Sequence, residues 1–236
     1  MLWYKNWLET RFRIVFMLLF AMFPIALHTL TPLPGGSAHQ GSAVEMRGAV
    51  GFFALYYSII PLALAGSGIK TQSPFRATKG LHGSMYFTLS LPVSRFQLLA
   101  ARVSVGMLET ILVLAILPCA IWTIFPPLRN YVTGSDLLKY WLTVSICAFA
   151  LHFLGVLLST VLDDLWQNWT SIFGVFFLRW ILSRAPLPES ANIFRAMGES
   201  SPLFTHSLPW TTMGFSLAVA AVLFLISMRV VERREY

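Results

Sequence analysis

The sequence predicts an all-α protein that crosses a membrane several times. Hydrophobic residues make up 56% of the 236 residues and charged residues only 11%, which leaves too few polar groups for an ordinary soluble surface. The apolar residues form continuous runs of about 20, the helical length that spans a bilayer core of about 30 Å. Because these runs do not alternate between apolar and polar residues, they exclude the strands of a transmembrane barrel.

Six runs meet the length requirement, and each is predicted to form a transmembrane helix. They cover residues 14–33, 49–69, 103–125, 140–162, 165–183 and 210–228. Only Asp163 and Asp164 separate the fourth run from the fifth, which predicts a helical hairpin with a tight turn. No separate soluble domain fits between the runs, so residues 1–236 are predicted to form a single transmembrane domain.

Lysine and arginine residues near the ends of the runs predict which side of the membrane each loop occupies. Three basic clusters precede the first run, separate the second from the third, and follow the last. The positive-inside rule places such clusters in the cytoplasm, so both termini and residues 70–102 are predicted to be cytoplasmic, and residues 184–208 extracytoplasmic. Anionic lipid headgroups account for the net charge of +7, and no nucleic-acid partner is expected.

Residues 1–13 are predicted to form a helix that lies on the cytoplasmic surface of the membrane. As a helix, this segment gathers Trp3, Trp7 and Phe12 on one side and charged residues on the other, and tryptophan favours the membrane interface. The alternative is that these residues form the first turns of the first span.

Small residues predict where the spans pack closely. The second run carries a stripe of small or kinking residues at steps of three and four, which lets another helix approach. The stripe consists of Gly51, Ala54, Ser58, Pro61, Ala65 and Gly68. In the fourth run, His152 belongs to a shorter stripe, and it is predicted to form an interhelical hydrogen bond rather than to bind a ligand.

Glu109 is an acidic residue about two turns into the third run. A carboxylate at that depth costs about 2 to 3 kcal/mol unless it is paired or hydrated. It is therefore expected to point into the bundle or into a cavity. A structural ion pair and a role in substrate handling or gating both fit this position.

No pattern in the sequence predicts a catalytic, cofactor-binding or metal-binding site in this chain. The string GSGIKT at residues 66–71 lacks the Gly-Lys pair and the spacing of a phosphate-binding loop, so the chain is not expected to bind ATP. Asp163 and Asp164 are interpreted as a polar turn rather than a Mg²⁺ site, because no third acidic residue follows them at helical spacing.

The cytoplasmic segment 70–102 is basic and partly amphipathic, with apolar residues around Tyr86 and Leu89. Pro92 biases the residue before it away from helical geometry. Ser94 is suited to cap a new helix that begins near Arg95 and continues into the third run. A surface element joined rigidly to a spanning helix can transmit a push, so a soluble partner is expected to dock here.

In this segment the chain resembles the permease subunits of type 2 ATP-binding cassette exporters. In that family a glycine, an apolar stretch and a phrase like LSLPVSR precede the third of six spans. The matching residues here are Gly83, Leu89, Ser90, Leu91, Pro92, Val93, Ser94 and Arg95. The amphipathic WLETRFR before the first run and the basic ERREY at the end are also similar. Lys79 and His82 depart from the pattern, because an acidic residue is common there.

The resemblance implies an exporter permease of the prokaryotic plasma membrane. Two such chains, identical or similar, would enclose a pathway through the lipid, while separate cytoplasmic ATPases would bind ATP and Mg²⁺. The coupling helix between the second and third spans, residues 86–95 with Tyr86 included, would dock on the ATPase. The outer segment 184–208 would form either a lid or an irregular loop. The chain itself is not expected to be an enzyme.

Two functions from other classes are also compatible with the sequence. An intramembrane enzyme could use Glu109, His152, Asp163 and Asp164, although these residues are expected at different depths and reacting groups must first meet in space. A non-transporting membrane anchor could recruit a soluble complex through the same segment 70–102.

Overall fold

The computed structural model describes residues 2–30, 43–65, 94–124, 129–162, 164–185, 188 and 191–233. Within these residues the regular structure is helical and no strand occurs, which confirms the all-α prediction. The helices are α1 (Leu2–Leu30), α2 (Ala43–Tyr57), α3 (Ile59–Leu64), α6 (Arg95–Leu114), α7 (Ile116–Ile124), α8 (Gly134–Val161), α9 (Asp164–Arg184), α10 (Ile193–Met197), α11 (Pro202–Thr205) and α12 (Trp210–Arg233).

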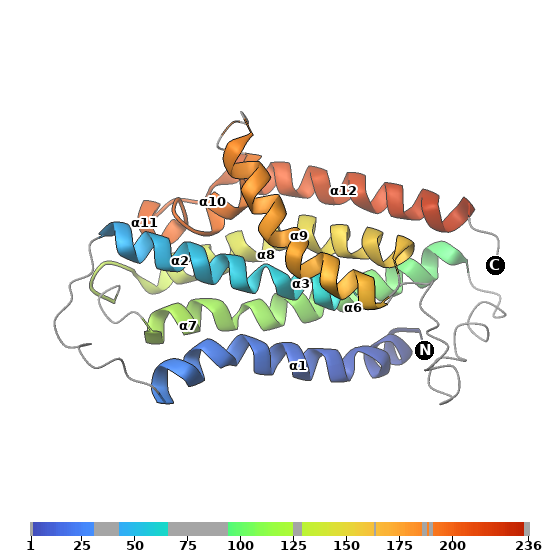
Figure 1. Ribbon diagram of the computed structural model, residues 1–236, viewed down its shortest axis with the longest axis horizontal. Helices are drawn as coiled ribbons and strands as arrows, with labels where there is room; N and C mark the ends of the chain where they lie inside the picture. Colours follow the sequence, from blue (N-terminus) through green and yellow to red (C-terminus); the bar gives the residue numbers. More distant parts are fainter. Residues whose placement is uncertain are drawn as a thin grey trace.

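Most of the long helices run along one direction and form an elongated bundle, which α9 crosses obliquely (Figure 1). The starts of α1 and α6 and the end of α12 lie at one end of this bundle, which we call the base. The starts of α2 and α8 lie at the opposite end, which we call the top. The chain therefore enters and leaves the described bundle at the base.

Four stretches of the described residues are long and apolar enough to cross a membrane. They are Arg47–Leu64, Leu99–Ile124, Gly134–Thr160 and Trp210–Arg233, and they coincide with the second, third, fourth and sixth predicted spans. The chain is thus built as an integral membrane protein. The first and fifth predicted spans are the helices α1 and α9, of 29 and 21 residues, and their place in the membrane stays a prediction.

The second and third spans are each interrupted three residues before a proline, within runs that the sequence predicted as single spans. Ser58 separates α2 from α3, and Pro61 follows it. Proline has no N–H, and its ring clashes with the carbonyl four residues earlier, here that of Tyr57. The Ser58 hydroxyl donates to the carbonyl of Ala54 at 2.6 Å, a bond that also bends helices. Likewise, Ala115 separates α6 from α7, and Pro118 follows three residues later.

Residues 2–13, predicted to form a surface helix, are the beginning of α1 and not a separate element. A helix of 29 residues is about 43 Å long, which exceeds the bilayer core of about 30 Å. The Tyr56 hydroxyl donates to the carbonyl of Phe20 at 2.8 Å, and the two rings stack with their centres 4.1 Å apart. These contacts attach α1 to α2.

The described part of segment 184–208, which was predicted to be extracytoplasmic, is folded onto the bundle. α10 packs against α2 and α8, and α11 packs against α8. The apolar side chains of these two short helices, among them Phe194, Met197 and Leu203, are buried in the large core that they share with α2 and α8. Residues 191–205 are therefore a structured cap near the top of the bundle and not an irregular loop.

Candidate functional site

Most residues expected to contact an ATPase lie outside the described residues. These are Gly83, Tyr86, Leu89, Ser90, Leu91, Pro92 and Val93, and Gly68 of the packing stripe lies outside them as well. Ser94 and the backbone of Arg95 are described, and they form the start of α6 at the base. The candidate site is consequently the end of α6 and the contacts that connect it to the bundle.

Ser94 is the N-cap of α6, as the sequence predicted. Its hydroxyl accepts a hydrogen bond from the backbone N–H of Gln97 at 3.2 Å. The Gln97 side-chain oxygen accepts one from the backbone N–H of Ser94 at 3.3 Å. This reciprocal pair is a capping box, which satisfies two backbone donors that the helix itself leaves open. The start of the helix is therefore fixed, and its 20 residues run from there into the bundle.

A small apolar cluster holds the first turns of α6 against three other helices. Leu99 and Val103 of α6 pack there with Ala65 after α3, Val156 of α8 and Val231 of α12. We call these five residues the base cluster. Beside it, Phe224 of α12 makes edge-to-face contacts with two phenylalanine rings, one on α6 and one on α8. A displacement of the start of α6 must move or repack the ends of α8 and α12.

His152 lies farther into the bundle, where α3, α6 and α8 meet, and it is completely buried. Its Nδ1 donates to the backbone carbonyl of Pro61 at 3.2 Å. Because a carbonyl only accepts, Nδ1 must carry the proton. The hydroxyl of Thr110 on α6 lies 3.5 Å from the same nitrogen and donates to the carbonyl of Gly106 at 2.7 Å. The histidine thus links α8 to α3, next to Thr110 of α6.

Two glycines allow the three helices to approach at this level. A Cβ atom at Gly106 would lie 2.8 Å from His152 Cε1 and 2.8 Å from the carbonyl oxygen of Leu64. A Cβ atom at Gly155 would lie 2.7 Å from that of Ala65 and 3.0 Å from the carbonyl oxygen of Leu62. Both positions therefore accept only glycine without a shift of the backbone.

The packing stripe predicted in the second run is buried where it is described. Gly51, Ala54, Ser58, Pro61 and Ala65 are all inaccessible to solvent or nearly so. Small residues at this spacing allow helix backbones to approach closely in lipid. The stripe thus faces other helices of the bundle.

Glu109 lies on α6 and is 2% exposed, so its carboxylate points into the protein. It precedes Thr110, whose hydroxyl lies 3.5 Å from His152, so Glu109 and His152 occupy nearly the same depth. The sequence had placed them at different depths, and that expectation was wrong. Asp163 and the side chain of Asp164 lie outside the described residues. Among the described residues no group of three or more histidine, cysteine or acidic side chains could hold a metal ion.

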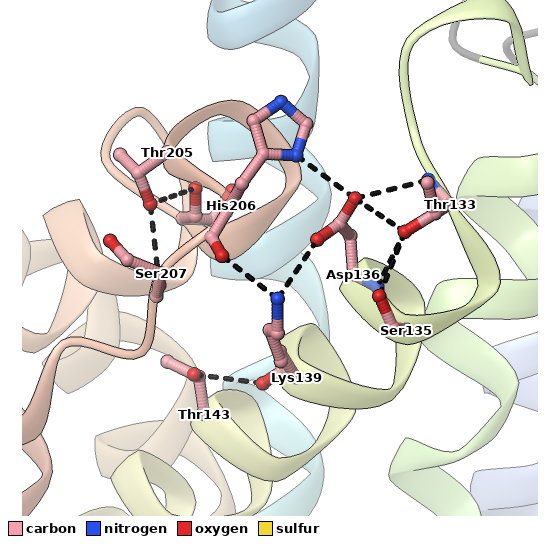
Figure 2. A network of polar contacts seen from close by, with 9 residues as sticks. Thr133, Ser135, Asp136, Lys139, Thr143, Thr205, His206 and Ser207 are labelled. Atoms are coloured by element: carbon pink, nitrogen blue, oxygen red, sulfur yellow. Dashed lines mark hydrogen bonds and ion pairs between the residues drawn. The ribbon is translucent and has the colours of Figure 1, made fainter.

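A polar network at the top fastens the start of α8 to the segment between α11 and α12 (Figure 2). Asp136 is buried at the first turn of α8. One of its carboxylate oxygens accepts from the backbone N–H of Thr133 at 3.0 Å, from the Thr133 hydroxyl at 2.7 Å and from His206 Nδ1 at 2.9 Å. The other accepts from Lys139 Nζ at 3.3 Å.

Lys139 and His206 both bond to Asp136, and they also bond to each other. Lys139 Nζ also donates to the backbone carbonyl of His206 at 2.8 Å. His206 has φ 55°, in the left-handed region, which a non-glycine residue adopts at a cost. The bonds to Asp136 and Lys139 hold this conformation. Sequence reasoning missed the site, although Thr133 followed three residues later by Asp136 is a readable capping signal.

Comparison with known proteins gave no family assignment: no protein-family model, no curated protein and no solved structure matched the chain.

Proposed function

We propose that this chain is the permease subunit of a type 2 ATP-binding cassette exporter of a prokaryotic plasma membrane. Its energy comes from separate ATPase subunits that bind ATP and Mg²⁺ and dock on residues 70–102. The observation that supports this most strongly is the start of α6, which is capped at Ser94 within that segment. From there one helix continues to the buried contact at His152.

The route from the docking segment into the bundle has two described steps. A partner that displaces the capped start of α6 strains the base cluster, and the strain reaches α8 and α12 through their shared apolar contacts. The close packing at Gly106 and Gly155 then resists independent movement of α3, α6 and α8. The ATPase shifts the permease between conformations only to the extent that it binds one of them more tightly.

The proposed membrane arrangement has six spans, with α1 and α9 as the first and the fifth. An even number of spans agrees with a chain that enters and leaves the described bundle at the base, and the positive-inside rule assigns this base to the cytoplasm. A second permease chain, identical or similar, completes the pathway. The cap formed by α10 and α11 then covers the extracytoplasmic side.

Co-purification and ATPase measurements test this function against the two alternatives. The chain is expressed together with the ATP-binding cassette protein encoded next to it, purified in detergent and reconstituted into liposomes. A permease retains the ATPase through purification and changes its rate of ATP hydrolysis. A membrane anchor retains a partner that hydrolyses no ATP, and an intramembrane enzyme needs no partner. Absence of a neighbouring ATPase, or an ATPase that neither binds nor responds, contradicts the proposal.

A further inference from the structure

A polar cavity lies between α2, α9 and α10, away from the helices that the proposed coupling uses. It is lined by Gly51, Arg179, Ser183, Asn192, Phe194, Arg195 and Glu199. Its volume is about 220 Å³, several times the roughly 30 Å³ that one water molecule occupies in the liquid. Five of the seven lining residues carry a charged, amide or hydroxyl side chain. Three of these five, Ser183, Arg195 and Glu199, are exposed, so the cavity opens to the surface.

Arg179 is the central charge of this cavity. It lies five residues before the end of α9 and is partly buried. One guanidinium N–H donates to the backbone carbonyl of Gly51 at 3.1 Å, so the side chain points across to α2 and away from the lipid. A guanidinium has five N–H donors, and this is its one hydrogen bond within the described part of the chain. The remaining donors are available to a ligand in the cavity.

The other polar groups determine the shape of the cavity more than they neutralise the charge of Arg179. The Asn192 amide donates to the carbonyl of Leu182 at 3.3 Å, and its oxygen accepts from the backbone N–H of Arg195. Asn192 thereby ties α10 to α9 and uses both of its polar ends. Glu199 is exposed and forms no ion pair within the described residues. Of the charged lining residues, Arg179 and Arg195 carry a positive charge and Glu199 a negative one.

One wall of the cavity is fixed by a contact between two glycines. A Cβ atom at Gly198 would lie 2.7 Å from the Cα of Gly51, so the backbone after α10 touches α2 directly. Because Arg179 bonds to the carbonyl of that same Gly51, its position relative to α10 is set by backbone atoms. The site is therefore preorganised and needs no rearrangement of helices to accept a ligand.

Aromatic and basic residues place this cavity at the level of the membrane surface. Trp180 directly follows Arg179, and Arg184 is the last residue of α9. Both side chains are exposed, and the Arg184 guanidinium lies over the Trp180 ring, 5.0 Å from its centre. Tryptophan and arginine gather at the depth of lipid headgroups. A guanidinium matches the geometry of a phosphate, with which it forms paired hydrogen bonds.

We infer that the cavity between α2, α9 and α10 binds the phosphate of an anionic ligand, with Arg179 as the principal contact. The phosphate belongs either to the headgroup of an anionic phospholipid or to a soluble anion that enters from the top. This inference does not depend on the proposed function, because it uses no residue of the base or of the segment 70–102.

The test compares the purified wild-type chain with the variants Arg179→Gln and Arg184→Gln. Native mass spectrometry measures retention of phosphatidylglycerol over phosphatidylcholine after both are added in equal amounts. Thermal unfolding of the delipidated protein measures stabilisation by inorganic phosphate. Arg179→Gln is expected to lower the affinity for the ligand that the wild-type chain binds by at least about tenfold. This corresponds to the loss of roughly one charge-assisted contact. Arg184→Gln changes an exposed residue of the same helix that does not line the cavity, so it is expected to leave binding unchanged.

The two arms distinguish the sources of the phosphate. Selective retention of phosphatidylglycerol that depends on Arg179 identifies a lipid headgroup site. Stabilisation by inorganic phosphate that depends on Arg179, without selective lipid retention, identifies a soluble anion. Wild-type protein that shows neither effect, or effects equal in both variants, overturns the inference. The variant Arg179→Lys guards against misfolding of Arg179→Gln, since it keeps the positive charge at this position and is expected to retain part of the binding.

Discussion

His152 Nδ1 lies 3.2 Å from the backbone carbonyl oxygen of Pro61, and this contact joins α8 to the bent second span. The same carbonyl also accepts the backbone N–H of Ala65 at 3.1 Å. A buried N–H with no partner would cost free energy in an apolar interior, so the carbonyl determines where the ring lies. The bend at Pro61 and the position of His152 are thus parts of one arrangement.

Replacing His152 with alanine is expected to destabilise the bundle by about 2 kcal/mol. The change removes an interhelical hydrogen bond, which contributes about 0.6 kcal/mol on average in membrane proteins, and leaves a cavity that adds to the cost. Chemical unfolding in detergent measures the loss. His152→Asn should recover part of the stability, because its amide can donate from nearly the position of Nδ1. An asparagine variant as unstable as the alanine variant would show that the hydrogen bond contributes nothing measurable.

Gly155→Ala is expected to destabilise the protein, although alanine favours helices. The added Cβ would lie 2.7 Å from the Cβ of Ala65, and such overpacking typically costs about 1 to 3 kcal/mol. Gly174→Ala is the matched control, since a Cβ there meets nothing within 4 Å and should gain up to about 1 kcal/mol of helix propensity. The melting temperatures of the two variants should shift in opposite directions from that of the wild-type protein. Equal shifts would mean that α3 and α8 are not in close contact.

Asp136→Ala is expected to lower stability by about 1 to 2 kcal/mol and to loosen the segment around His206. The variant removes the N3 half of the capping box of α8 and every contact of the buried carboxylate with Thr133, Lys139 and His206. Limited proteolysis between α11 and α12 reports the loosening. Ser135→Ala removes only the contact of an exposed hydroxyl with the Thr133 hydroxyl at 2.9 Å and keeps every bond of Asp136, so it should change both measurements much less. Unchanged proteolysis in Asp136→Ala would show that the network does not hold this segment.

Arg95→Glu is expected to uncouple ATP hydrolysis from transport while the protein remains inserted in the membrane. Arg95 begins α6 directly after the capping Ser94, where a reversed charge alters the contact with the partner without removing the cap. Transport and ATP hydrolysis are measured in the same vesicles. Arg129→Glu reverses an exposed charge near the top and should leave coupling intact. Normal transport by Arg95→Glu would remove this position from the mechanism.

Features carried by neighbouring residues were readable from the sequence, whereas features made by distant residues were not. Ser94 could be identified as a cap because its partner lies three residues away. Pro61 could be included among small or kinking residues because its effect on the preceding turn is local, although the sequence did not locate the break at Ser58. The bonds of Asp136 with His206 and of Arg179 with Gly51 join residues 70 and 128 positions apart. No local pattern encodes such pairs.

The relative depth of Glu109 and His152 shows the same limit. Run boundaries in the sequence set the ends of helices to within a few residues only. The offset between two neighbouring helices depends on how their small residues fit together, here at Gly106 and Gly155. Depth therefore follows from packing rather than from counting residues.

Labelling of a single cysteine at position 79 tests the central claim, that the segment between α3 and α6 faces the cytoplasm. Lys79→Cys is introduced into a variant in which Cys119 and Cys147 are replaced by alanine, and Ser135→Cys near the top serves as the opposite marker. A membrane-impermeant maleimide is expected to label residue 135 but not residue 79 in intact cells, and residue 79 in inverted vesicles. Labelling of residue 79 from outside intact cells would contradict the account.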